Sequence, residues 1–162
     1  MDGALFALER GVQTAPKAYD LWIEYGELRA FKDNRPLAIH AASISLNDPL
    51  VRPRALKLIA NIAQKYFKEG QLADALKTVH VAHGFQEEKV ELAWLRAQIS
   101  EATRQPEESK RWLQVVLDLE PNHRKAICML QKINTGTLKH HRRNKGPTKL
   151  TSNKRKWWSR EL

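Results

Sequence analysis

Cysteine is almost absent from this chain of 162 residues, which contains Cys128 alone. A single cysteine cannot form a disulfide within the chain, so a reducing, intracellular setting is the simpler expectation. No apolar run exceeds five residues, whereas a membrane-spanning helix needs about 20. We therefore expect no transmembrane helix. The N-terminal stretch, interrupted by Glu9 and Arg10, also lacks the pattern of a secretory signal.

Signatures of catalysis are missing as well. The seven glycines are scattered, and none belongs to a Gly-rich loop that could cradle a phosphate. His80 and His83 lie three residues apart on one expected helix, but no third ligand follows at a spacing that suits a metal. Cys128 is expected to be a small core residue of the last helix. The sequence therefore predicts no enzyme activity, no cofactor and no metal site.

What the chain does contain is helical periodicity. Eight segments carry apolar residues at helical spacing, and no stretch alternates like a strand for more than a few residues. Glycine or proline separates several of them, in "LNDP", "KEGQ", "RQPE" and "LEPN". The expected helices are 1–11, 18–31, 36–46, 53–68, 72–83, 89–103, 106–119 and 122–133. Short helices with tight links predict an all-α antiparallel stack.

The second half of this helical region repeats at an interval of 34 residues. The aligned pairs are Ala63 with Ala97, Ala75 with Ser109, Val79 with Leu113 and Ala82 with Val116, and Leu76 with Lys110 is a mismatch. A period of 34 residues with two helices per unit resembles the tetratricopeptide repeat (TPR) family, and "YFKEGQLADALKTVHVA" and "VVLDLEPN" carry the resemblance. Small residues at these positions let paired helices approach closely.

The resemblance implies an α-solenoid of about three helix pairs, which start at Tyr19, Leu56 and Val90. A lone helix precedes the pairs and a closing helix follows, so residues 1–134 form the repeat domain. The third pair departs most from the family, for instance with Arg104 where glycine is preferred. The stretch "LWIEYGELRA" is weakly similar to half-a-TPR (HAT) repeats, which occur in RNA-processing complexes. A generic helical bundle is the alternative fold.

The TPR resemblance also implies a binding groove, lined by the first helix of each pair. Carried onto this sequence, the groove positions are Ile23, Glu27, Phe31, Lys57, Asn61, Gln64, Phe67, Trp94 and Gln98. Family members that clamp a terminal carboxylate of a chaperone use Lys, Asn, Asn, Lys and Arg. Only Asn61 agrees here, so a clamp of that kind is disfavoured. The three aromatic residues of the set could line the groove or pack between helices.

A basic tail follows the last expected helix. Residues 135–162 hold nine of the 28 basic residues and one of the 18 acidic ones, so the remaining 134 residues are nearly neutral. The tail has few apolar residues, and we expect it to be disordered on its own. Its candidate contacts to nucleic acid or another anion are Lys139, Arg142, Arg143, Lys145, Lys149, Lys154, Arg155, Lys156, Trp157 and Trp158.

Several functions suit such a tail. Cations neutralise phosphates while Trp157 and Trp158 stack on exposed bases, a combination typical of RNA or single-stranded nucleic acid. The pattern "RR", ten residues, "KRK" resembles a bipartite nuclear localisation signal. The tryptophans could instead contact an anionic membrane surface, which the sequence favours less. The tail could also serve only as a solvated end or as a docking segment for a protein.

Together these features favour a non-catalytic scaffold or adaptor that binds a protein or peptide through a TPR-like groove. Its expected location is intracellular, in the cytoplasm or, in a eukaryote, the nucleus. One alternative is an RNA-associated protein with the tail as its main binder. Another is the repeat portion, or a subunit, of an enzyme whose catalytic part lies elsewhere.

Overall fold

The computed structural model describes residues 2–85 and 89–136, and the regular structure in these ranges is entirely α-helical. The helices are α1 (Asp2–Thr14), α2 (Tyr19–Phe31), α3 (Arg35–Ser45), α4 (Arg52–Lys68), α5 (Leu72–Val81), α6 (Val90–Ala102), α7 (Pro106–Leu119) and α8 (Arg124–Asn134). The predicted all-α class is confirmed. Each expected helix is present, with ends that differ from the prediction by at most three residues.

The largest of these differences is at the end of α1, which continues to Thr14 instead of stopping at Gly11. A Cβ atom on Gly11 would lie 3.2 Å from Leu21 Cδ1, so the missing side chain lets α1 approach α2 closely. Glycine inside a helix costs about 1 kcal/mol relative to alanine. The close packing offsets that cost, and Val12 in the next position is buried.

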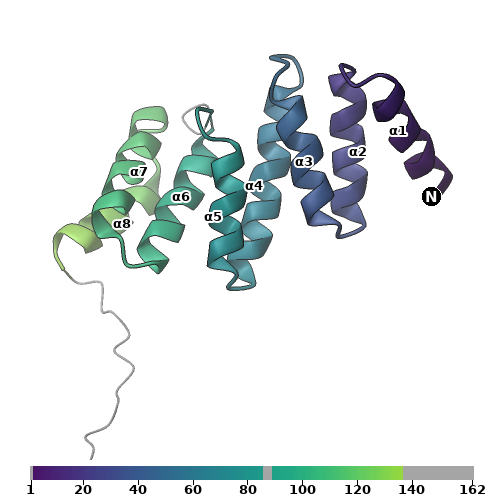
Figure 1. Ribbon diagram of the computed structural model, residues 1–162. Helices are drawn as coiled ribbons and strands as arrows, with labels where there is room; N and C mark the ends of the chain where they lie inside the picture. Colours follow the sequence, from purple (N-terminus) through teal and green to yellow (C-terminus); the bar gives the residue numbers. More distant parts are fainter. Residues whose placement is uncertain (1, 86–88, 137–162) are drawn as a thin grey trace, which may run out of the picture.

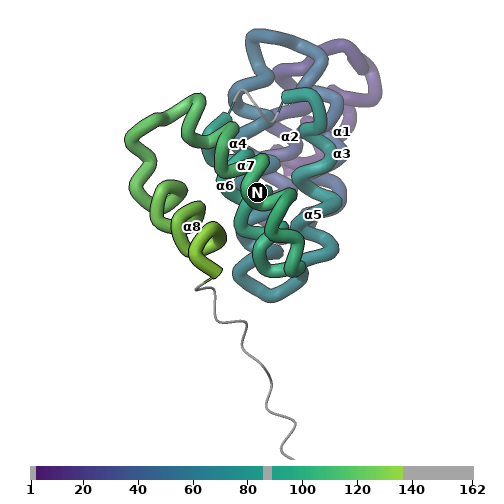
Figure 2. The backbone as a smooth tube through the Cα atoms, turned by 90° about the vertical axis from the view of Figure 1, so that its left-hand side faces the viewer, coloured from purple at the N-terminus to yellow at the C-terminus, as the bar shows by residue number. Residues whose placement is uncertain are grey.

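The helices lie side by side in chain order, from α1 at one end of the row to α7 and α8 at the other (Figure 1). Helix α4 contacts both α2 and α6, and α3 contacts α5. In the view along the row, α4, α6 and α8 lie on one side while α3 and α5 lie on the other (Figure 2). Helices α4, α6 and α8 therefore form one layer, and α3 and α5 lie on the other side of them (Figure 2).

Small residues lie where the two helices of a pair meet. Ala63 of α4 and Ala75 of α5 are fully buried, as are Ala97 of α6 and Ser109 of α7. The Ser109 Oγ donates a hydrogen bond of 3.0 Å to the Ala97 carbonyl, which satisfies the buried hydroxyl. The burial of these four positions is what the 34-residue pattern predicts.

The turn that follows the first helix of each pair has the same backbone geometry three times. Asp33, Gly70 and Arg104 have positive φ angles of 58°, 78° and 61°. In each turn the next N–H donates to a carbonyl five residues back: Asn34 to Arg29 at 2.8 Å, Gln71 to Tyr66 at 2.9 Å and Gln105 to Ser100 at 2.8 Å. This is the Schellman arrangement, which satisfies the last carbonyls of a helix. The sequence repeat is therefore also a backbone repeat.

The link between α3 and α4, residues 46–51, is longer than the links between α2 and α3 and between α4 and α5. One prediction about the core is wrong. Cys128, expected to be a core residue of α8, is exposed instead. The inward side of α8 is formed by Ala126 and by Met129, Leu130 and Ile133, which pack against the core. Cys128 lies outside that apolar stripe.

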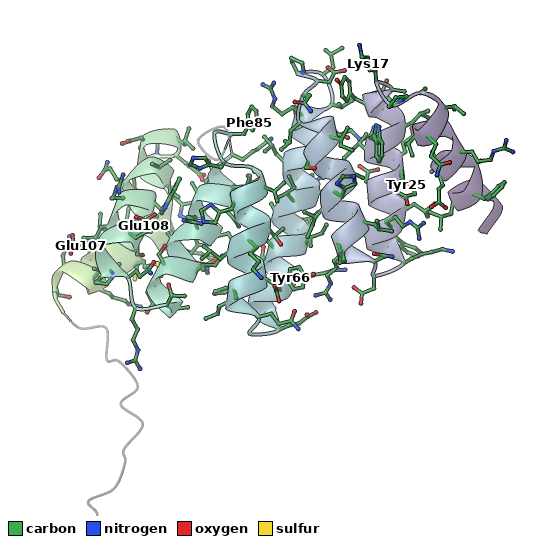
Figure 3. All side chains as sticks on the ribbon, viewed as in Figure 1. Lys17, Tyr25, Tyr66, Phe85, Glu107 and Glu108 are labelled. Atoms are coloured by element: carbon green, nitrogen blue, oxygen red, sulfur yellow. The ribbon has the colours of Figure 1, made fainter. Side chains whose placement is uncertain are left out.

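Ion pairs connect neighbouring helices. The Arg35 guanidinium at the start of α3 donates two hydrogen bonds of 2.6 Å to the Glu69 carboxylate, which follows the end of α4. These hydrogen bonds hold the pKa of the Glu69 carboxyl below its ordinary value. Arg35 also lies 4.8 Å from the ring centroid of Tyr66, which is labelled in Figure 3. The pair ties the start of α3 to the end of α4.

Candidate functional site

Four adjoining depressions follow one face of the row, along α2, α4, α6 and α8. Their volumes are about 430 Å³ between α2 and α4, 310 Å³ between α4 and α6, 530 Å³ between α6 and the start of α8, and 460 Å³ between α6 and α8. Asn61 and Gln64 line both of the first two, and Trp94 and Gln98 line both of the last two. Gln64 also borders the third, so we call the four together the groove.

Most of the residues that the sequence assigns to a groove do border it. Those that line at least one depression are Glu27, Phe31, Lys57, Asn61, Gln64, Trp94 and Gln98. Ile23 does not, because it is fully buried in the same core cluster as Leu46 and Val51 of the longer link. Phe67 is half-buried and packs against that core. Ile23 therefore lies in the core and not on the groove surface, and Phe67 borders none of the four depressions.

The two remaining aromatic residues differ in exposure. Phe31 is 73% exposed and borders the depression between α2 and α4. Trp94 is half-buried, with its ring centroid 5.1 Å from that of His123. The His123 Nδ1 accepts a hydrogen bond of 3.1 Å from the Ala126 N–H and so caps the N-terminus of α8. Trp94 is thus held in place, whereas Phe31 presents its ring to solvent.

The charged groove residues are mostly cations. Glu27 is engaged with Arg54, whose Nη2 lies 2.9 Å from the carboxylate, and this hydrogen bond raises the pKa of Arg54. Lys57 and Lys68 of α4 form no ion pair with the residues that the structure describes. Sequence reasoning missed Lys68 and its neighbour Lys65, although both continue the face of Lys57 at helical spacing.

Three side-chain amides also border the groove. Asn61 and Gln64 are exposed on α4, and Gln98 is half-buried on α6. The Oε1 of Gln98 is buried and accepts no hydrogen bond from the described residues. An amide offers both donors and an acceptor, so these groups can bind the main chain of another molecule.

A second polar cluster joins α5, α6 and α7. The Arg96 Nη1 lies 3.0 Å from the Nε2 of His80, which must accept because a guanidinium only donates. Arg96 also lies 3.9 Å from Glu108, a residue labelled in Figure 3. Burial lowers the pKa of His80 most, and the charges of Arg96 and His83 lower it further. The charge of Glu108 opposes this shift. Burial lowers the pKa of Arg96.

Metal ligands do not gather in this cluster. The rings of His80 and His83 are 6.3 Å apart. Across residues 2–85 and 89–136, no three His, Cys, Asp or Glu residues lie close enough together to hold a metal ion. The Arg96 guanidinium next to His80 would also repel a cation.

The candidate residues of the tail, from Lys139 to Trp158, lie outside the described residues. Within the described ranges, no helix has the length and apolar character to cross a membrane. No protein-family model matches the sequence, and none of the curated proteins compared with it is similar enough to be a relative.

Proposed function

We propose that this chain is a TPR-like α-solenoid that acts as a non-catalytic scaffold and binds a peptide segment of a partner protein in the groove. The observation that carries the proposal is a continuous groove, bordered by four helices, with an exposed aromatic ring at one end and free amides along it. The repeated Schellman turns and the buried small residues support the solenoid part.

Energetics favour a partner at Phe31. Burial of apolar surface contributes about 25 cal/mol per Å², and an aromatic side chain buries about 150–250 Å². Because Phe31 is 73% exposed, covering its ring contributes on the order of 3–5 kcal/mol to association. That is enough for a single anchor but not for tight binding, so the rest of the groove must contribute.

Peptide display on the immobilised full chain tests this function. Selected peptides are expected to bind the wild type and to lose about tenfold or more in affinity on Phe31→Ala, because the anchor is removed. Phe6→Ala is the matched control: Phe6 is also an exposed phenylalanine, at 62%, but lies on α1 and borders none of the four depressions. If both variants bind the selected peptides like the wild type, the groove is not the binding site.

A further inference from the structure

The groove has an uneven charge. Among its lining residues in the described part of the chain, seven are Lys or Arg and four are Glu. One of the four, Glu27, is already paired with Arg54. The cations at the α4 end are Lys57, Lys65 and Lys68, with Lys89 just before α6. A ligand that binds across this end is therefore held more tightly if it carries negative charge.

The amides indicate the conformation of the ligand. A helical ligand has already satisfied its own main-chain N–H and C=O groups, whereas an extended one presents them free. Asn61 and Gln64 have no hydrogen bond to other described residues, and the Oε1 of Gln98 is buried without a donor. A main-chain N–H near Gln98 would supply the missing donor once the side-chain amide turns toward the groove.

We propose that the groove binds an extended acidic peptide. The amides of Asn61, Gln64 and Gln98 hydrogen-bond its main chain, and the lysines at the α4 end pair with its carboxylates. Apolar side chains of the peptide pack against Phe31 and against Trp94. The inference rests on the proposed function and adds the class of ligand, its conformation and the residues that select it. A free C-terminal carboxylate is not required, because the amides act on internal main-chain groups.

A peptide fits the groove better than a nucleic acid does. Glu91, Glu101 and Glu120 also border it. A nucleic acid carries a phosphate at every nucleotide, so some phosphates would lie against these carboxylates. A peptide can instead place acidic residues near the lysines and neutral residues near the glutamates. The mixed charge therefore favours a polymer with spaced charges.

Fluorescence anisotropy with short, C-terminally amidated peptides tests the charge preference. The acidic probe alternates Asp and Glu with Leu and Phe, and the basic probe has Lys in place of each acid. We expect the full chain to bind the acidic probe about tenfold or more tightly. Lys57→Gln with Lys68→Gln should lower the affinity for the acidic probe by about fivefold or more. Equal binding of the two probes, or no effect of this pair, would overturn the proposal.

The control pair is Lys77→Gln with Lys110→Gln. It changes the net charge by the same amount, but Lys77 on α5 and Lys110 on α7 border no part of the groove. We expect it to alter binding of the acidic probe by less than about twofold. If it weakens binding as much as the groove pair, the affinity reflects net charge alone and the proposal fails.

Gln98→Met tests the main-chain contact, since it keeps the length of the side chain and removes its hydrogen bonds. It should weaken binding of the acidic probe by about fivefold. A version of the probe with N-methylated central amides should bind both proteins equally, because the donor has been removed. The melting temperature should not fall, which separates a binding role from a structural one. An unchanged affinity for the ordinary probe would overturn the main-chain contact.

Two other outcomes separate this inference from the proposed function. If displayed peptides bind in a Phe31-dependent manner but are neutral or basic, the acidic preference is wrong and the scaffold function stands. If no peptide binds through Phe31, both fail. Oligouridine provides the nucleic-acid comparison. Should it bind the full chain more tightly than the acidic probe, and should Lys57→Gln with Lys68→Gln abolish this, the groove is a nucleic-acid site and the proposal is overturned.

Discussion

Arg104 occupies a backbone conformation that suits glycine. Its φ of 61° places it in the left-handed region, like Gly70 at φ 78° in the preceding repeat. For a residue with a side chain this conformation costs roughly 1–2 kcal/mol. Glycine avoids that cost but adds about 0.4–1 kcal/mol of entropy to the unfolded state. We therefore expect Arg104→Gly to stabilise the protein by about 0.5–1 kcal/mol.

The measurement is thermal and urea unfolding of the full chain followed by circular dichroism. A gain of 1 kcal/mol corresponds to about 2–4 °C in a chain of this size. Arg104→Ala is the control, because it removes the side chain but retains the strained φ, and it should change little. The Arg104 side chain is exposed and forms no hydrogen bond or ion pair with the described residues, so little is lost with it.

The reciprocal change is Gly70→Ala. A Cβ at Gly70 would meet nothing within 4 Å, so any loss of stability comes from the backbone alone. We expect a loss of about 1 kcal/mol. The reasoning is refuted if Arg104→Gly destabilises the protein, or if Arg104→Ala stabilises it as much as Arg104→Gly does. The second outcome would mean that the arginine side chain, and not the φ angle, carries the cost.

Three further predictions concern the core, the pH response and the tail. Ala75→Trp should unfold the second repeat, because Ala75 is fully buried and overpacking costs about 1–3 kcal/mol or more; an unchanged melting curve would remove the repeat assignment. His80 has a lowered pKa in the folded state, so the unfolded chain binds the proton first and stability falls as the pH drops below about 6.5. His80→Gln should flatten this dependence in urea titrations from pH 7 to pH 5, and equal slopes would contradict it. For the tail, affinity for single-stranded RNA should fall with salt at a log–log slope of about −0.7 per phosphate. Replacing Trp157 and Trp158 by alanine should weaken binding by roughly 1–3 kcal/mol per stacked base without changing that slope; an unaltered affinity would favour protein docking or membrane contact.

The helices and their pairing could be predicted from the sequence because their determinants are local. Apolar spacing within one segment sets the buried face of a helix, and glycine or proline marks its end. The 34-residue interval, together with the resemblance to the TPR pattern, assigns small residues such as Ala75 and Ser109 to helix contacts, and both are fully buried. Gly11 shows the limit of this reasoning, since contact with Leu21 in the next helix turned an expected helix end into a helix interior.

The exposure of the groove residues could not be predicted from the sequence pattern. Ile23 and Phe31 both occupy expected groove positions on α2, yet Ile23 is fully buried and Phe31 is 73% exposed. Ile23 belongs to the core cluster that also contains Leu46 and Val51 of the link between α3 and α4, whereas Phe31 does not belong to it. Spacing places a residue on a face of its own helix, but it does not state how far the neighbouring chain extends over that face.

The sequence by itself determined the all-α class, the helices of the described residues and the small residues at their contacts, because each depends on neighbours within one or two turns or on a fixed repeat. The tertiary structure decided that Arg104 takes a left-handed conformation, that Cys128 faces outward and that the Gln98 acceptor is buried without a donor among the described residues. These properties depend on groups far apart in the chain. Burial and hydrogen bonding are set by every atom within a few ångströms, and only the packed helices bring those atoms together.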